Sequence, residues 1–383
     1  MSPAVAYFRG LFSKYVGGTN RGDAELPSRP RAGFRIAGRS GSNLRALRRV
    51  CSLTAACLAS IGGLLGEPKI AQAAAICANP VPTAGWQTVT VISGGLHRPV
   101  PLYVPSSATG RSNLPLVFDL HGSEENGPEQ ARRSGLVAQA DLHGFLVANP
   151  NGGIAYPDNS TDHFYWHVPG VPLYGGVALP ANAPDDVQFF RDAIAQLTQV
   201  VCVDAHRVYV TGFSGGARMA SVLACELADR IAAVAPVAGL RAGIPRPGDL
   251  TAPDPKTCQP TRAVPIVTFH GVHDPTNRFD GDGESRWGYS VPVALANWGR
   301  VDGCQAIPVE QRISAHVTRV SYLGCRNTAE LILYRIDAPV DHGGGHIWPH
   351  PGTFMPDPVA VTEQVDELDA SALIWDFFSR HPH

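Results

Sequence analysis

Hydrophobic residues alternate along the chain between two spacings, one typical of buried strands and one typical of helices. Leu114–Leu120 is almost continuously apolar and ends at His121-Gly122, which predicts a strand buried on both faces. Asp185–Val201 instead repeats apolar residues every three or four positions, which predicts a helix. Strands are predicted at 87–92, 100–104, 114–120, 145–150, 207–211, 232–239, 264–269 and 331–336, and helices at 128–143, 185–201, 217–224 and 370–380. This alternation predicts an α/β fold, with a mostly parallel sheet covered by helices on both faces.

The first 73 residues have a different character. Residues 1–49 are rich in arginine, residues 50–65 are apolar and uncharged, and Ala71-Gln72-Ala73 follows as a small-x-small sequence. Because the apolar run is shorter than the about 18 residues of a spanning helix, this order predicts a secretory signal peptide and no stable membrane anchor. A buried N-terminal helix is the alternative, and Arg48-Arg49 also fits twin-arginine export. We therefore expect a leader over 1–73, a single domain over 74–383, and a secreted, extracellular protein.

The charge balance changes once this leader is set aside. The leader holds 11 of the 31 Lys and Arg residues and 3 of the 33 Asp and Glu residues. The chain after it therefore has 20 basic and 30 acidic residues, a net charge near −10. Such an acidic chain does not favour nucleic acid or an anionic membrane as a partner.

Six cysteines follow the leader, namely Cys77, Cys202, Cys225, Cys258, Cys304 and Cys325. An even number in an exported chain predicts disulfides, with free buried cysteines as the alternative. None has a CxxC or Cys/His spacing, so we expect no metal and no other cofactor. We expect a Cys304–Cys325 bond and a Cys202–Cys225 bond around the predicted 207–211 strand, which leaves Cys77–Cys258 by exclusion.

Gly212-Phe213-Ser214-Gly215-Gly216 stands between a predicted strand and a predicted helix. Strand, Gly-x-Ser-x-Gly and helix in this order are typical of a nucleophile elbow, in which glycines allow a sharp turn that lifts the serine hydroxyl above the sheet. The alternative is a glycine-rich turn that contains a serine by chance. The elbow also aims the Gly215 N–H at a reacting carbonyl oxygen, and Ser123, after the 114–120 strand, is the candidate second donor.

A nucleophilic serine needs a base, and the base needs a third group that orients it. Asp274 follows the predicted 264–269 strand and would lie at the carboxyl end of the sheet, with Asp280 and Asp282 as competitors. A cluster of histidines follows the last predicted strand, and His342, His346 and His350 compete for the role of base. The chain order Ser, acid, His is the one that this elbow architecture uses.

Residues 156–183 form a long segment rich in proline, glycine and aromatic residues, with no clear period. Long ordered loops in compact domains tend to be functional. We expect Trp166 from this segment and Trp348 beside His346 to form an apolar wall that binds substrate. Ordinary packing of a surface loop is the alternative explanation for its aromatic residues.

Together these motifs resemble the polyhydroxybutyrate depolymerase family of secreted esterases, which is close to bacterial feruloyl and acetylxylan esterases. The resemblance covers residues 86–380 and rests on Leu120-His121-Gly122, Cys202-Val203-Asp204, the elbow at 212–216, His270-Gly271-x-x-Asp274 and Gly344-Gly345-His346-Ile347-Trp348-Pro349. It implies an α/β-hydrolase fold, a Ser214-Asp274-His346 triad and no metal. His346 is selected over the other two histidines by this resemblance alone.

The resemblance and the residues lead to one expected function with two alternatives. We expect a serine carboxylic-ester hydrolase acting through an acyl-enzyme on hydroxyalkanoate polyester, its oligomers or related short esters. Feruloyl or acetylated polysaccharide esters are the alternative substrates. An α/β-hydrolase that binds ligands without catalysis is the alternative from another class, which the presence of all three triad residues disfavours.

Overall fold

The computed structural model describes residues 83–156, 162–340, 343–351 and 368–383. Contacts divide the chain into two units, 1–69 and 70–383, and every described residue belongs to the second. The expected signal peptide and its cleavage site lie outside the described residues. No helix in the described part of the chain combines the length and the apolarity that crossing a membrane requires.

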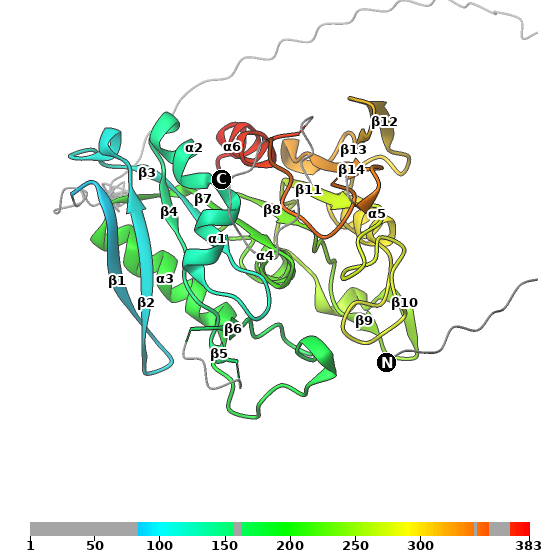
Figure 1. The fold of residues 1–383 in the computed structure, drawn as a ribbon, viewed down its shortest axis with the longest axis horizontal. Coiled ribbons are helices and arrows are strands. Elements are labelled where there is room, and N and C mark those ends of the chain that lie inside the picture. The colour runs from blue at the N-terminus through cyan, green and yellow to red at the C-terminus, as the bar shows by residue number, and fades with distance from the viewer. Residues whose placement is uncertain (1–82, 157–161, 341–342, 352–367) are drawn as a thin grey trace, which may run out of the picture. The chain divides into compact units, whose positions relative to one another are not determined.

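A ten-stranded sheet forms the centre of the second unit (Figure 1). Six parallel neighbours make its middle, in the order β4 (Leu146–Ala148), β3 (Leu114–Leu120), β7 (Val203–Phe213), β8 (Ala233–Val237), β11 (Ile266–Gly271) and β14 (Leu331–Ile336). Antiparallel strands extend both edges, β1 (Gly85–Ser93) and β2 (Leu96–Val104) on one side and β13 (Val317–Tyr322) and β12 (Val309–Arg312) on the other. This arrangement confirms the predicted mostly parallel sheet and is that of an α/β-hydrolase.

Helices cover both faces because successive side chains of each central strand point to opposite sides. On β3, Phe118 belongs to one hydrophobic core and Val117 to the other. The first core packs against α3 (Asp186–Val200), α4 (Gly215–Glu226) and α5 (Val291–Val301), and the second against α2 (Leu136–His143) and α6 (Ala370–Arg380). Because the six central strands are parallel, all of them end at the same edge of the sheet, where the loops carry the candidate residues.

Several elements differ from the prediction. The helix predicted at 128–143 is two helices, α1 (Gly127–Ser134) and α2, because Gly135 takes a left-handed conformation with φ of 61°. Helix α5 and strands β12 and β13 were not predicted. Four short segments of the described loops also form strands, in two small hairpins; they are β5 (Ile154–Ala155) with β6 (Phe164–Tyr165), and β9 (Pro245–Arg246) with β10 (Asp249–Pro253).

The disulfides confirm one predicted pair and contradict the other two. Cys304 is bonded to Cys325, as expected. Cys225 is bonded to Cys258, so the predicted Cys202–Cys225 and Cys77–Cys258 pairs are wrong; Cys202 is disulfide-bonded as well, but not to Cys225. The reason is spatial: the end of α4 meets the segment that follows β10, and the Cα atoms of Cys225 and Cys258 are 4.9 Å apart.

We expect the Cys225→Ser, Cys258→Ser double variant to lose roughly 3–4 kcal/mol of unfolding free energy, because the bond closes a 33-residue loop in the unfolded chain. Urea unfolding of both proteins measures the difference. Peptide mapping without reductant provides the control, and a peptide that links Cys202 to Cys225 would contradict the pairing.

Candidate active site

Ser214 occupies a strained turn between β7 and α4. Its φ is 52° and its ψ is −109°, a conformation that residues other than glycine rarely adopt. The Ser214 N–H donates to the Val237 carbonyl oxygen at 3.0 Å, and the Arg218 N–H donates to the Ser214 carbonyl oxygen at 3.1 Å. These bonds to β8 and to α4 hold the turn, so the hydroxyl is fixed above the carboxyl end of the sheet.

The glycines around Ser214 are required by close backbone contacts. A Cβ atom on Gly216 would lie 2.3 Å from the Leu120 carbonyl oxygen, and one on Gly212 would lie 2.7 Å from the Gly216 carbonyl carbon. Both distances are too short for a real Cβ atom. The turn can therefore pack against the end of β3 only with glycine at these positions.

Asp274 and His346 form a hydrogen-bonded pair at the same edge of the sheet. The His346 Nδ1 atom lies 2.7 Å from Asp274 Oδ2, and the Asp274 carboxylate is fully buried while the His346 side chain is 16% exposed. The other Asp274 oxygen, Oδ1, accepts the N–H groups of Thr276 and Asn277 at 2.8 Å each. Because an ionised carboxylate only accepts, Nδ1 carries the proton and Nε2 is left as the basic nitrogen.

The competing aspartates do not make this contact. Asp280 and Asp282 are exposed, and Asp282 Oδ1 accepts the backbone N–H groups of Glu284 and Gly288 within its own loop. His342 lies outside the described residues. Of the aspartates considered, Asp274 is the one that contacts His346.

His346 also lies beside the strained serine, since its ring and that of Phe213 have centroids 4.7 Å apart. No hydrogen bond joins the Ser214 hydroxyl to the His346 ring in the structure. Such bonds are often long in unliganded hydrolases and tighten when substrate binds.

His270 supports the Asp274 loop, a role that sequence reasoning did not assign although the residue stands in the His-Gly-x-x-Asp motif. Its Nε2 atom lies 2.8 Å from the Asn277 carbonyl oxygen and 3.4 Å from Asp274 Oδ2. Burial lowers the pKa of His270 to about 4, so the ring is neutral at neutral pH. A neutral His270 can donate to Asn277 without placing a second positive charge beside Asp274.

Ser123 and Gly215 lie next to each other, as the predicted oxyanion pair requires. A Cβ atom on Gly215 would lie 2.5 Å from Ser123 Oγ and 2.9 Å from Ser123 N. Among the described residues, no protein acceptor receives a hydrogen bond from either backbone N–H. Two neighbouring N–H groups without protein acceptors are suited to binding an oxygen that gains negative charge.

His121 and Trp166 fix the loop that carries Ser123. The buried His121 ring accepts the Gly152 N–H on Nε2 at 3.0 Å, so its Nδ1 donates to the Gly122 carbonyl oxygen at 2.6 Å. Burial lowers the pKa of His121 to about 4, which keeps this ring neutral. The Trp166 indole N–H donates to the His121 carbonyl oxygen at 2.8 Å, and the two rings pack with centroids 4.8 Å apart.

The structure does not bring Trp166 and Trp348 into one wall. Trp166 is 4% exposed and belongs to the core on the α3 and α4 side, although its edge lines a small pocket with Ser123 and Gly215. Trp348 is 7% exposed and belongs to the opposite core, where its indole N–H donates to Ser371 of α6 at 3.0 Å. The sequence suggested a shared cleft because both tryptophans stand in segments with no clear period. It could not show that each side chain is buried in a different core.

Within the described residues there is no group of three or more His, Cys, Asp or Glu side chains that could hold a metal ion. The fold is that of an α/β-hydrolase. The serine turn and the Asp–His pair lie at the carboxyl ends of its strands, as they do in that class of enzyme.

Comparison with known proteins assigns the family. A family profile described as esterase PHB depolymerase matches residues 99–247. A protein of Aspergillus niger named as a feruloyl esterase C is 30% identical over 255 residues, which cover 63% of this chain and 78% of that protein. The chain belongs to the PHB depolymerase family of esterases and is a carboxylic-ester hydrolase.

Two further relatives extend the comparison. NocK of Nocardia uniformis subsp. tsuyamanensis, a protein named as an esterase, is 28% identical over 78% of this chain and 84% of its own length. Poly(3-hydroxyalkanoate) depolymerase C of Paucimonas lemoignei is 33% identical over 36% of this chain and 30% of its own. Two other curated relatives are longer proteins, of which the chain covers 42% and 22%.

We expect Asp274→Asn to leave a folded protein with roughly ten-thousand-fold lower ester hydrolysis, by analogy with a comparable triad, because an amide would favour the wrong histidine tautomer. Initial rates on nitrophenyl acetate measure the loss. Asp280→Asn and Asp282→Asn are the matched controls, and a comparable loss in either would move the acid to that position.

We expect Trp166→Phe to lower kcat by a similar factor, roughly tenfold, for a small acetate ester and for a bulky ester, because the change removes the hydrogen bond that holds the His121 carbonyl. Trp298→Phe is the matched control, since it removes an equally buried indole bond to the Arg241 carbonyl oxygen, also 2.8 Å long. Altered ranking of the two esters in Trp166→Phe would instead assign the indole to substrate contact.

Proposed function

We propose that the protein is a serine esterase in which Ser214 is the nucleophile, His346 the base and Asp274 the group that orients the base. The observation that carries this proposal is the 2.7 Å contact between His346 Nδ1 and Asp274 Oδ2, beside a serine in a strained elbow. In this mechanism His346 Nε2 takes the Ser214 proton as the hydroxyl oxygen bonds to the ester carbonyl carbon. Asp274 remains ionised and stabilises the imidazolium ion that forms.

The Ser123 and Gly215 N–H groups would then hold the carbonyl oxygen as it becomes negative. Removal of one such donor in a comparable enzyme raises the activation barrier by roughly 3–4 kcal/mol. The alcohol leaves with the proton from His346, and the acyl group remains on Ser214. Water hydrolyses this acyl-enzyme with His346 again as the base, which returns the free acid and the free serine.

We further propose that the substrates are short esters of small acyl groups, with hydroxyalkanoate oligomers as the leading class. The pocket beside Ser123 and Gly215 is narrow, and aromatic side chains (Tyr165, Trp166 and Tyr174) form much of its lining. Next to the proposed oxyanion pair, such a narrow space favours a slender acyl chain over a feruloyl ring. Acetylated polysaccharide is the second candidate, since acetyl is also small and a relative from Neocallimastix patriciarum is named as a bifunctional acetylxylan esterase and xylanase. Export of the mature chain over 74–383 by a signal peptide remains part of this proposal.

We expect Ser214→Ala to fold normally and to lose ester hydrolysis by about a million-fold, as triad knockouts do in a comparable enzyme. Labelling of the wild-type protein, but not of this variant, by a fluorophosphonate probe identifies the nucleophile. Hydroxybutyrate oligomers, methyl ferulate and acetylated xylan form the substrate panel. Labelling that persists in the variant would show that another residue is the nucleophile.

A further inference from the structure

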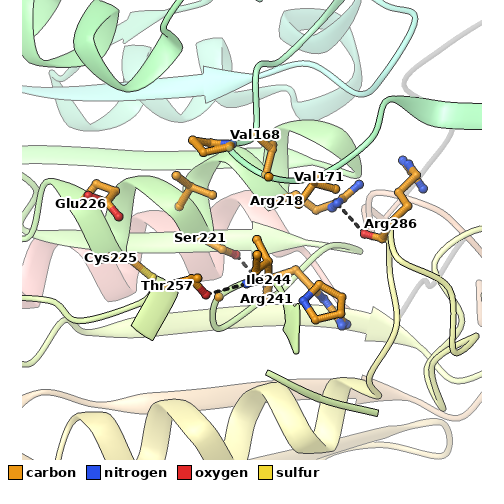
Figure 2. Close-up of a pocket in the computed structure, with 15 residues that line it drawn as sticks. Val168, Val171, Arg218, Ser221, Cys225, Glu226, Arg241, Ile244, Thr257 and Arg286 are labelled. Carbon is orange, nitrogen blue, oxygen red and sulfur yellow. Dashed lines mark hydrogen bonds between the residues drawn. The ribbon is translucent and has the colours of Figure 1, made fainter. Parts of the chain in front are cut away.

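Three arginines line a cavity of about 330 Å³ that adjoins the candidate active site (Figure 2). Arg218 lies on the first turn of α4, Arg241 follows β8, and Arg286 precedes α5. The cavity shares Val168, Val171, Arg218 and Arg286 with the small pocket that contains Ser123 and Gly215. It therefore lies next to the space beside the proposed oxyanion pair.

No carboxylate pairs with these guanidinium groups in the described part of the structure. Arg218 is 4% exposed and Arg241 is 5% exposed. Glu226 is the acidic residue of the lining, but it is an exposed residue at the other end of α4, and Figure 2 places it on the far side of the cavity from Arg218 and Arg286. Asp282, whose charge acts on all three arginines, is exposed and accepts hydrogen bonds within its own loop.

Each guanidinium also keeps a buried nitrogen that has no hydrogen-bond partner among the described residues, namely Arg218 Nε, Arg241 Nη2 and Arg286 Nε. Arg241 is otherwise well held, since it donates to the carbonyl oxygens of Leu240, Trp287 and Tyr289. Arg218 donates to the Arg286 carbonyl oxygen at 2.5 Å. Burial and the charges of Arg286 and Arg241 lower the pKa of Arg218. Unpaired buried cations are costly, and binding of an anion would remove that cost.

The rest of the lining indicates the kind of anion. Apolar side chains form most of it, among them Val168, Val171, Val222, Ile244 and Pro245. An inorganic anion needs polar partners on several sides, whereas an organic carboxylate brings a hydrocarbon part that fits apolar walls. Arginine donors match the two oxygens of a carboxylate.

We propose that this cavity binds a free carboxylate carried by the ester substrate, so that the enzyme prefers esters of hydroxy acids that end in a carboxyl group. This inference rests on the proposed function, because it takes Ser214 as the reacting centre. The walls of the cavity are fixed, since the Cys225–Cys258 bond joins α4 to the segment after β10 and both Cys225 and Thr257 line it.

The test compares a hydroxybutyrate dimer that has a free carboxyl end with its methyl ester, at neutral pH. We expect the wild-type protein to have a kcat/KM roughly ten- to a hundredfold higher for the acid, as charged hydrogen bonds of this kind contribute. Arg286→Gln and Arg218→Gln should each bring the ratio of the two values close to one. Arg286 is the safer variant, because its side chain donates no hydrogen bond to any of the described residues; its guanidinium lies over the Tyr174 ring.

Arg300→Gln on α5 is the matched control, since Arg300 is exposed and outside the cavity, and it should keep the wild-type ratio. Equal values for the two substrates in the wild-type protein would overturn the inference, and so would an equal loss for both substrates in the arginine variants. Inhibition by inorganic phosphate as strong as that by free 3-hydroxybutyrate would show a general anion site instead.

Ser214→Ala separates this inference from the proposed function. Hydrolysis that survives in Ser214→Ala would contradict the proposed function. In that same variant, calorimetry with free 3-hydroxybutyrate should detect binding that Arg286→Gln abolishes. An inactive Ser214→Ala protein that binds no carboxylate would overturn the cavity assignment alone.

Discussion

The close contact between the serine turn and the end of β3 determines the rest of the site. Gly216 lies against the Leu120 and His121 carbonyl oxygens so tightly that no side chain fits between them. Because α4 begins at this contact, the Gly215 N–H lies beside Ser123 from the β3 loop. The same approach forces Ser214 into its unfavourable φ, and the hydrogen bonds to β8 and α4 hold that strain. The position of the serine and that of the two N–H donors thus have one physical cause.

The groups around this contact are held by buried histidines that remain neutral. His121 connects the β3 loop to Gly152, and His270 connects β11 to the loop after Asp274. Both have a pKa near 4 because burial disfavours the charged ring. A charged imidazolium at either place would add a positive charge near the Ser123 loop or beside Asp274. Preorganised neutral dipoles of this kind need no rearrangement when charge develops on a substrate.

Much of the fold and of the site could be predicted from local sequence, because periodicity and glycine patterns are local. The central strands and most helices followed from the spacing of apolar residues, and the elbow followed from its glycines. Helix α5 was missed although Ser290 caps its start and Pro292 stands in its first turn, a pattern that could have located it. The cysteine pairing and the burial of Trp166 could not be predicted, because both depend on how loops from distant segments pack together.

The corrected disulfide changes how the space beside the serine is understood. A Cys202–Cys225 bond would have joined α4 to the strand that precedes it, which already contacts it. The observed Cys225–Cys258 bond instead joins α4 to the segment near β9 and β10, where Ile244 and Thr257 stand opposite Arg218. Because α4 also carries the Gly215 N–H and the first turn after Ser214, a single covalent link connects one of the proposed oxyanion donors to the wall of the cationic cavity. A rigid wall keeps buried arginines from turning outward to water, and here the Arg241 guanidinium also lies 3.3 Å from the centre of the Trp287 ring, which stabilises its charge in the absence of an acidic partner among the described residues.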